Sequence, residues 1–183
     1  MTELEINLEF TPNPNMLKYV VNKVILLTGA EYYRNKEEAE GFSPLAIKLF
    51  DIGVKSVMFG NNFITVGMEN QDNLREMNRD IMACIKSHIS EGLEICRPKD
   101  DVDIADEDDS SRRIREILDT EIRPAVAQDG GDISFMRYEG GVVYVHMKGA
   151  CSGCPSSTMT LKMGIEARLK NEIPDIQEVV PIM

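Results

Sequence analysis

The chain has 183 residues, of which 20 are basic and 31 acidic, so its formal net charge at pH 7 is −11. A field of that sign repels phosphate groups, which excludes nucleic acid as the main partner. The four cysteines are too few for a disulfide-built scaffold of this length, and no apolar run approaches the roughly 20 residues that span a bilayer, so we expect no membrane association.

The beginning of the chain has the pattern of a β-sheet. Strict alternation of apolar and polar residues over 4–10 predicts a half-buried strand. The segment 11–15 contains two prolines and predicts a turn, because proline cannot donate to a strand ladder. Residues 16–21 then predict a second strand, with 24–27 as its extension.

Two helices and a hairpin are predicted further along. Ser43 as N-cap and Pro44 as first helical residue predict the start of a helix. Residues 55–59 and 63–68 flank a Gly-Asn-Asn turn and predict a hairpin. Asp72 is expected to cap a long amphipathic helix. These elements together indicate an α+β domain.

An acidic segment follows. Residues 100–111, DDVDIADEDDSS, include seven acidic side chains whose mutual repulsion favours an extended, solvated chain. An acidic docking tail is the alternative to a plain linker. We therefore predict two small α+β domains, residues 1–97 and 112–183, joined by a flexible acidic linker over 98–111.

The last part of the chain predicts a second α+β unit. Ser110 or Ser111 is expected to cap a helix, which Pro124 should end or bend. The remaining predicted elements are a turn at 129–132, a hairpin from 133–138 and 142–147, a helix from Pro155 to about Lys170, and a closing strand at 177–181.

One cysteine pair, Cys151 and Cys154, lies between a predicted strand and a predicted helix. The spacing lets both sulfurs reach one metal ion or one cluster. The partial positive charge at the start of the helix is expected to favour the thiolate over the thiol. The neighbours Gly149, Ala150 and Gly153 are small, so backbone amides can approach a bulky cluster. Cys151 and Cys154 are therefore the predicted ligands.

The number of ligands points to a dimer. A tetrahedral zinc ion or a [4Fe–4S] cluster takes four thiolates, whereas the chain supplies one such pair. Cys84 is expected to be a small apolar residue within a helix, and Cys96 a surface thiol. Two chains that face each other across a two-fold axis would complete the ligand set, so we predict a homodimer.

Other interpretations stay open at this point. A structural zinc site has the same spacing, because spacing does not select the metal. A thiol–disulfide oxidoreductase is the alternative from another class, although no βαβ context surrounds the pair. His146 could be a metal ligand or a proton relay, although a histidine in a strand commonly has no such role. His88 lies near the end of a helix whose C-terminus favours positive charge, and it needs no function.

Longer motifs resemble a known family. The segments EILDTEIRPAVAQDGGDI, GACSGCPSSTMTLKMGIEARLK and IPDIQEVVP resemble the NifU-like C-terminal domain of Nfu proteins, and TPNPNMLKY and SPLAIKLFDIGVKSVMFGNNFITV resemble the Nfu N-terminal domain. The resemblance implies an iron–sulfur cluster scaffold or carrier and no enzymatic reaction. It implies a [4Fe–4S] cluster bound between two chains by Cys151 and Cys154, with a [2Fe–2S] form left open. Upstream cluster donors and apo iron–sulfur proteins would be the partners.

The first residues, MTELEINLEF, contain neither a basic segment nor an apolar stretch typical of a targeting signal. Eukaryotic members of the family usually carry a mitochondrial transit segment, and none is visible. From this we expect a cytoplasmic protein.

Overall fold

The structure is a computed structural model that describes residues 4–27, 29–97, 108–151 and 155–182, with only the backbone described over 155–158. The chain forms two compact units, an N-terminal unit, Met1–Asp101, and a C-terminal unit, Val102–Met183. Each combines helices with a β-sheet, which confirms the predicted fold class of two small α+β domains. The predicted linker over 98–111 lies mostly outside the described residues, so its character stays a prediction.

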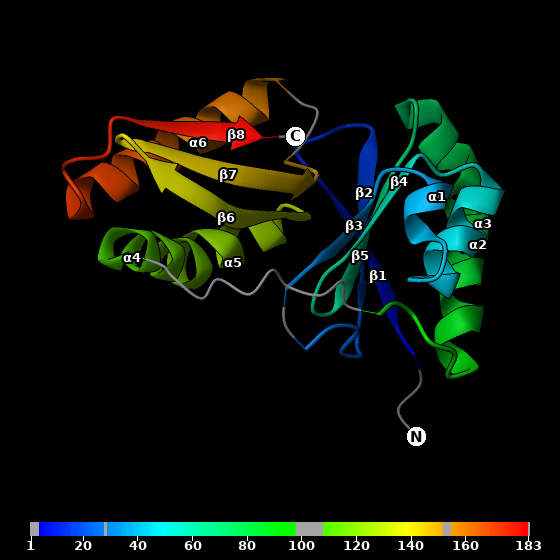
Figure 1. Ribbon diagram of the computed structural model, residues 1–183. Coiled ribbons are helices and arrows are strands. Elements are labelled where there is room, and N and C mark those ends of the chain that lie inside the picture. The colour runs from blue at the N-terminus through cyan, green and yellow to red at the C-terminus, as the bar shows by residue number, and fades with distance from the viewer. Residues whose placement is uncertain (1–3, 28, 98–107, 152–154, 183) are drawn as a thin grey trace. The chain divides into compact units, whose positions relative to one another are not determined.

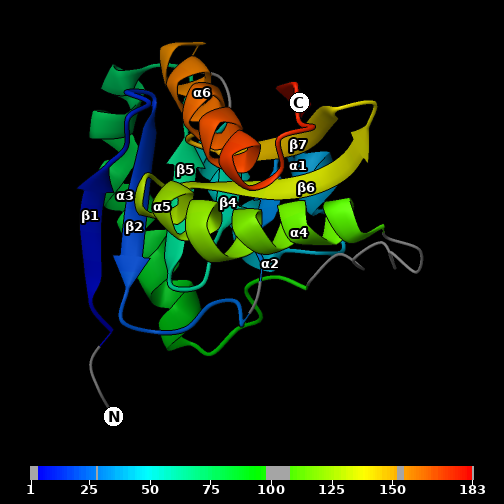
Figure 2. The same ribbon diagram turned by 90° about the vertical axis from the view of Figure 1, so that its left-hand side faces the viewer.

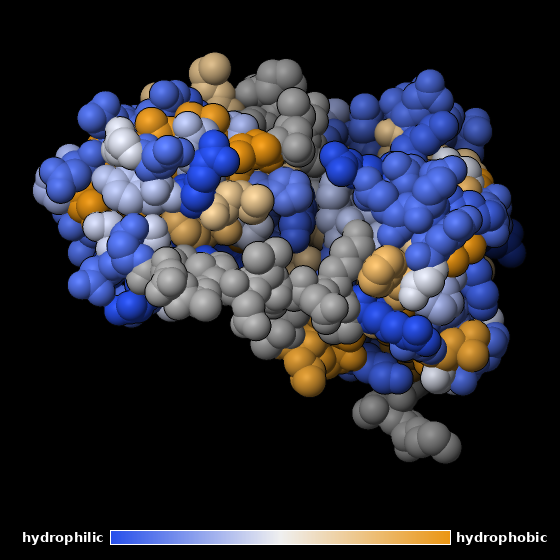
Figure 3. All heavy atoms as spheres, in the orientation of Figure 1, coloured by the Kyte–Doolittle hydropathy of each residue, from blue (hydrophilic) through white to orange (hydrophobic). Residues whose placement is uncertain are grey.

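The N-terminal unit is a five-stranded antiparallel sheet with helices on one face (Figure 1). Its strands, in spatial order, are β1 (Ile6–Phe10), β2 (Met16–Val21), β5 (Phe63–Gly67), β4 (Ser56–Phe59) and β3 (Glu31–Tyr33). Its helices are α1 (Lys36–Ala39), α2 (Pro44–Ile52) and α3 (Gln71–Ser90). Apolar residues of β2, β4 and β5 form one core with those of α2 and α3. The outer surface of the helices is mostly hydrophilic where Figure 3 shows it.

Several local predictions for this unit are confirmed. Ser43 is the N-cap of α2, and its Oγ accepts a hydrogen bond from the Ala46 N–H over 3.0 Å. The 55–59 and 63–68 segments form the β4–β5 hairpin. The cap of α3 differs from the prediction, because Asn70 and not Asp72 accepts from the first turn, at Asn73 N–H. Both side chains are suitable caps, and local sequence did not distinguish them.

Residues 22–41 differ most from the prediction. The expected extension of β2 over 24–27 is absent from the described part of that segment, because the Ile25 and Leu26 N–H groups donate instead to the Asn61 carbonyl in the β4–β5 turn. The short elements β3 and α1, which were not predicted, follow. Neither is long enough to show a clear apolar period in the sequence.

The C-terminal unit is a three-stranded sheet with helices packed on it. Its strands are β6 (Gly131–Glu139), β7 (Val142–Gly149) and β8 (Glu178–Ile182), in that order. β6 and β7 are antiparallel and β8 is parallel to β7. α4 (Asp109–Ile117) packs along β6, and α6 (Pro155–Glu172) packs along β8 (Figure 1). Their shared core is separate from that of the other unit and includes Ile114, Ile133, Val145, Ile165 and Leu169.

The helix before β6 starts earlier and continues further than predicted. Asp108 is the N-cap of α4, accepting from Ser111 N–H over 2.7 Å, so neither predicted serine caps the helix. Pro124 does not end it: a π-helical turn, η1 (Leu118–Ile122), leads into α5 (Arg123–Gln128), and Figure 2 shows one continuous helical run. Arg123 N–H donates to the carbonyl of Leu118, five residues back. The wider turn accommodates a proline ring that an α-helix interior would exclude.

None of the helices in the described ranges combines the length and apolar character needed to cross a membrane.

Candidate functional site

Cys151 lies two residues after the end of β7 and belongs to the core of the C-terminal unit. Its side chain is 6% exposed. The second predicted ligand, Cys154, lies outside the described residues, as does the loop that joins the two. The pairing of the two thiols therefore stays a prediction, and the geometry of the site rests on Cys151 and its neighbours.

Two paired glycines shape the chain around Cys151, and one of them makes room for its thiol. Gly131 at the start of β6 pairs with Gly149 at the end of β7. A Cβ atom added to Gly131 would lie 2.3 Å from Cys151 Sγ and 3.1 Å from the Lys148 carbonyl oxygen. Gly149 has a φ of 64°, a left-handed conformation that turns the chain into the cysteine segment. The sequence assigned Gly131 only to a turn, so its contact with the thiol was missed.

The surroundings of Cys151 oppose ionisation of the thiol. Burial, followed by the negative charges of Asp129 and Asp132, raises the pKa of Cys151 to about 12. At neutral pH the thiol is therefore protonated in the protein without metal. This is opposite to the prediction that the helix N-terminus favours the thiolate. The sequence argument failed because it took no account of the burial of the thiol or of the carboxylates at the end of α5 and the start of β6.

An ion-pair network lies next to the cysteine. The Asp132 side chain, at the start of β6, is only 5% exposed and accepts from Arg123 Nε at 2.7 Å and Nη2 at 3.4 Å. Arg123 Nη1 also donates to Asp119 of η1 at 3.0 Å. Through Arg123 the network joins η1 and the start of α5 to β6, the strand whose first residue contacts Cys151. The sequence allowed a metal contact at the turn over 129–132 but favoured a plain turn, and it did not find Arg123, because Arg123 and Asp132 meet only after β6 packs on α5.

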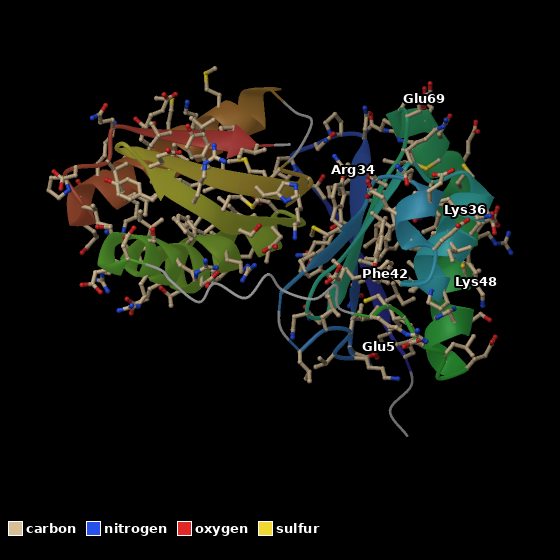
Figure 4. The ribbon with its side chains drawn as sticks, viewed as in Figure 1. Glu5, Arg34, Lys36, Phe42, Lys48 and Glu69 are labelled. Carbon is tan, nitrogen blue, oxygen red and sulfur yellow. The ribbon has the colours of Figure 1, made fainter. Side chains whose placement is uncertain are left out.

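The other two cysteines lie in the N-terminal unit. Cys84 and Cys96 are both half-buried and pack against its core. Cys84 agrees with the prediction of a small apolar residue. Cys96 is not the surface thiol that was expected, since burial raises its pKa to about 12. Its segment is held against the start of α2, where Ser43 Oγ donates to the Ile95 carbonyl (2.7 Å) and Arg97 N–H to that of Phe42, labelled in Figure 4 (2.8 Å).

Neither histidine joins the cysteine site in the described structure. His146 lies in β7, opposite Ser134 of β6. His88 is 1% exposed, and its Nε2 lies 2.9 Å from the Glu94 carbonyl oxygen. Its Nδ1 has no hydrogen-bond partner within the ranges that the structure covers. Burial lowers the pKa of His88, which disfavours the charged form that a helix C-terminus would otherwise favour. Within those same ranges, no three potential ligands gather for a metal ion.

The buried His88 predicts a loss of stability in acid. Its pKa in the folded protein lies below the ordinary 6.5, because burial and Lys48 of α2 (labelled in Figure 4) outweigh the Glu94 carbonyl and Glu91. As the pH falls below 6.5, His88 becomes protonated in the unfolded chain but stays neutral in the native chain. The free energy of unfolding therefore decreases. Urea unfolding above and below that pH, followed by circular dichroism, should show a smaller pH effect in His88→Gln than in wild type. Equal pH effects in the two proteins would contradict this.

Comparison with known proteins gives matches over both units. Residues 6–92 match the family model described as "Scaffold protein Nfu/NifU N terminal", and residues 114–180 match the "NifU-like domain". The protein named "NFU1 iron-sulfur cluster scaffold homolog, mitochondrial" from Drosophila persimilis is 41% identical over 179 residues, covering 95% of this chain and 64% of its own length. The protein of the same name from Drosophila grimshawi is also 41% identical over 179 residues, covering 95% of this chain and 60% of its own.

A solved structure is also similar. The NMR structure of the NifU-like protein from Saccharomyces cerevisiae is 22% identical, with a TM-score of 0.47 over 52% of this chain and 87% of that one. The chain spans 60% to 64% of the length of the two Drosophila relatives. Because those relatives are named mitochondrial, the predicted cytoplasmic location is contradicted. The prediction of location was based on the first residues, which are not a sound basis in a chain that spans only part of its relatives' length.

Proposed function

The chain belongs to the Nfu family, with an Nfu N-terminal domain followed by a NifU-like domain, and from this we propose that it is an iron–sulfur cluster scaffold. In this proposal Cys151 and Cys154 of two chains hold one [4Fe–4S] cluster between them. The protein carries the cluster and catalyses no covalent reaction. It receives the cluster from an upstream donor and passes it to apo iron–sulfur proteins.

The observation that carries the proposal is the setting of Cys151. Its Sγ approaches the backbone of Gly131 at a position where any side chain would collide with it. The thiol thus packs where the start of β6 meets the end of β7, in the domain that matches the NifU-like model over residues 114–180. A cysteine fixed in this way is suited to act as a ligand of a bulky cluster.

The raised pKa of Cys151 bears on how a cluster would be taken up and released. The thiolate is the ligand, so binding must remove a proton that the folded protein holds up to about pH 12. A ligand that is costly to ionise gives up its metal more readily than a preformed thiolate. That property favours transfer over permanent storage, and two ligands per chain act in the same direction.

Anaerobic reconstitution with iron and sulfide tests the proposal. The expected product is a brown dimer with about four irons per two chains, the content of one [4Fe–4S] cluster with four cysteine ligands. Absorption, Mössbauer spectra and size-exclusion chromatography on one sample would measure it, with a metal-free monomer as the reference. A colourless monomer that forms a reversible Cys151–Cys154 disulfide would contradict the scaffold and favour the thiol–disulfide oxidoreductase.

A further inference from the structure

A buried carboxylate lies beside the proposed cluster ligand. Asp132 is 3% exposed and directly follows Gly131, the residue against which Cys151 Sγ rests. It pairs with Lys148 across the β6–β7 ladder, one step from the Gly131–Gly149 pair where the chain leaves β7 toward Cys151. An ionised carboxylate removed from water is costly unless a cation and hydrogen bonds compensate it. Something must therefore neutralise Asp132 for the site to keep its shape.

Arg123 supplies that compensation. Two of its nitrogens meet the two Asp132 oxygens, Nε at 2.7 Å and Nη2 at 3.4 Å, as a forked, charge-assisted pair. A third nitrogen donates to Asp119 at 3.0 Å, which fixes the guanidinium from the side of η1. Figures 1 and 2 show α5, which begins with Arg123, lying against β6, and the two elements are in contact.

The negative charge of Asp132 matters because the proposed cluster is itself negatively charged. A [4Fe–4S] core with four thiolate ligands is an anion, and groups around a cluster set both its retention and its reduction potential. A bare carboxylate at Asp132, adjacent to the glycine that contacts Cys151, would repel that anion in a region where protein screens charge poorly. The Arg123 guanidinium offsets this repulsion through its pair with Asp132.

We propose that Arg123 is a positioning residue of the cluster site, which neutralises the buried Asp132 and so lets an anionic cluster remain beside Cys151. The inference rests on the proposed scaffold function and adds a residue outside the cysteine pair. According to this proposal, a variant without Arg123 loses the cluster because the Asp132 carboxylate is left without its cation. Removal of that carboxylate as well should therefore restore retention of the cluster.

The test compares loaded wild-type protein with Arg123→Gln, Asp132→Asn and the double variant. Arg123→Gln should lose its cluster about 10-fold faster or more, the usual scale for a lost outer partner of a metal ligand, and its reduction potential should fall. The double variant should regain most of the retention and the potential. Asp132→Asn alone should keep the cluster at a higher potential, which tests the idea even if Arg123→Gln does not fold.

Arg168→Gln is the matched control. Arg168 also makes a forked pair, with Glu121 at 2.7 and 2.8 Å, and its side chain is 30% exposed, the same as Arg123. Its partner is 45% exposed, so the cluster should be unaffected. Equal loss in Arg123→Gln and the double variant would overturn the inference, since it would indicate a merely structural role. Retention in Arg123→Gln would overturn it as well. Wild-type protein that takes up no cluster would overturn the proposed function and this inference together.

Discussion

Serine in place of either Cys151 or Cys154 is expected to abolish cluster binding and to leave the fold intact. Each substitution removes two of the four proposed ligands of a dimer-bridging cluster, and a hydroxyl does not replace a thiolate for iron. At Cys151 the buried hydroxyl should cost about 1–3 kcal/mol of stability, less than the 5–15 kcal/mol that typically holds a domain together. Iron and sulfide analysis after reconstitution, with circular dichroism of the apo-protein, measures both effects.

Cys84→Ser and Cys96→Ser are the controls for that experiment. Both residues pack on the core of the N-terminal unit, which has no residue in common with the core around Cys151. They should keep the wild-type cluster content, with at most a small loss of stability in their own unit. A full cluster in either Cys151→Ser or Cys154→Ser, or its loss in a control variant, would show that the proposed ligand set is wrong.

Alanine at Gly131 is expected to remove most of the cluster content while the protein still folds. The added methyl group would lie 2.3 Å from Cys151 Sγ, and the Lys148 carbonyl and Cys151 Cβ, both at 3.1 Å, block its escape. Sγ is the atom best able to move, so the thiol should rotate out of its position. Overpacking of this kind costs about 1–3 kcal/mol. Cluster content after reconstitution and the thermal unfolding temperature should therefore fall together.

Gly164→Ala separates this effect from a general effect of glycine replacement. Gly164 lies in α6, and a Cβ there meets nothing within 4 Å. Alanine in a helix interior should even stabilise the protein, by about 0.5–1 kcal/mol, without changing its iron content. If Gly131→Ala loads as much iron as Gly164→Ala, the close contact between Gly131 and the thiol is unimportant for the site.

Much of the fold could be predicted because its signals are local. Strand alternation, the Ser43-Pro44 helix start and both hairpins depend on residues near one another in sequence. The errors arise where local signals compete or are absent. Asp108 and Asn70 cap helices in place of the nearby Ser111 and Asp72, because several suitable caps occur within a few residues. The short elements β3 and α1 offer too few residues for a period.

The site was predictable only in part. The spacing of two cysteines pointed to Cys151 as a ligand, and its small neighbours suggested space for a cluster. The contact with Gly131, the burial of the thiol and the Arg123–Asp132 pair all depend on β6 and β7 lying in one register. No pattern along the chain reports that register for a buried thiol. Asp132 was assigned to a turn at 129–132, and its pairing with Arg123 had no signal in the sequence.

The π-helical turn at Leu118–Ile122 has a consequence for the angular position of everything after it. An α-helix advances about 100° per residue, so one extra residue in a turn rotates the following side chains by that amount about the axis. Arg123 is the first residue after the extra winding, and its guanidinium reaches β6. In a regular α-helix over the same stretch, the Arg123 side chain would be rotated by about a quarter of a turn about the helix axis. The orientation of the Arg123 charge is thus set by the winding of the backbone at η1.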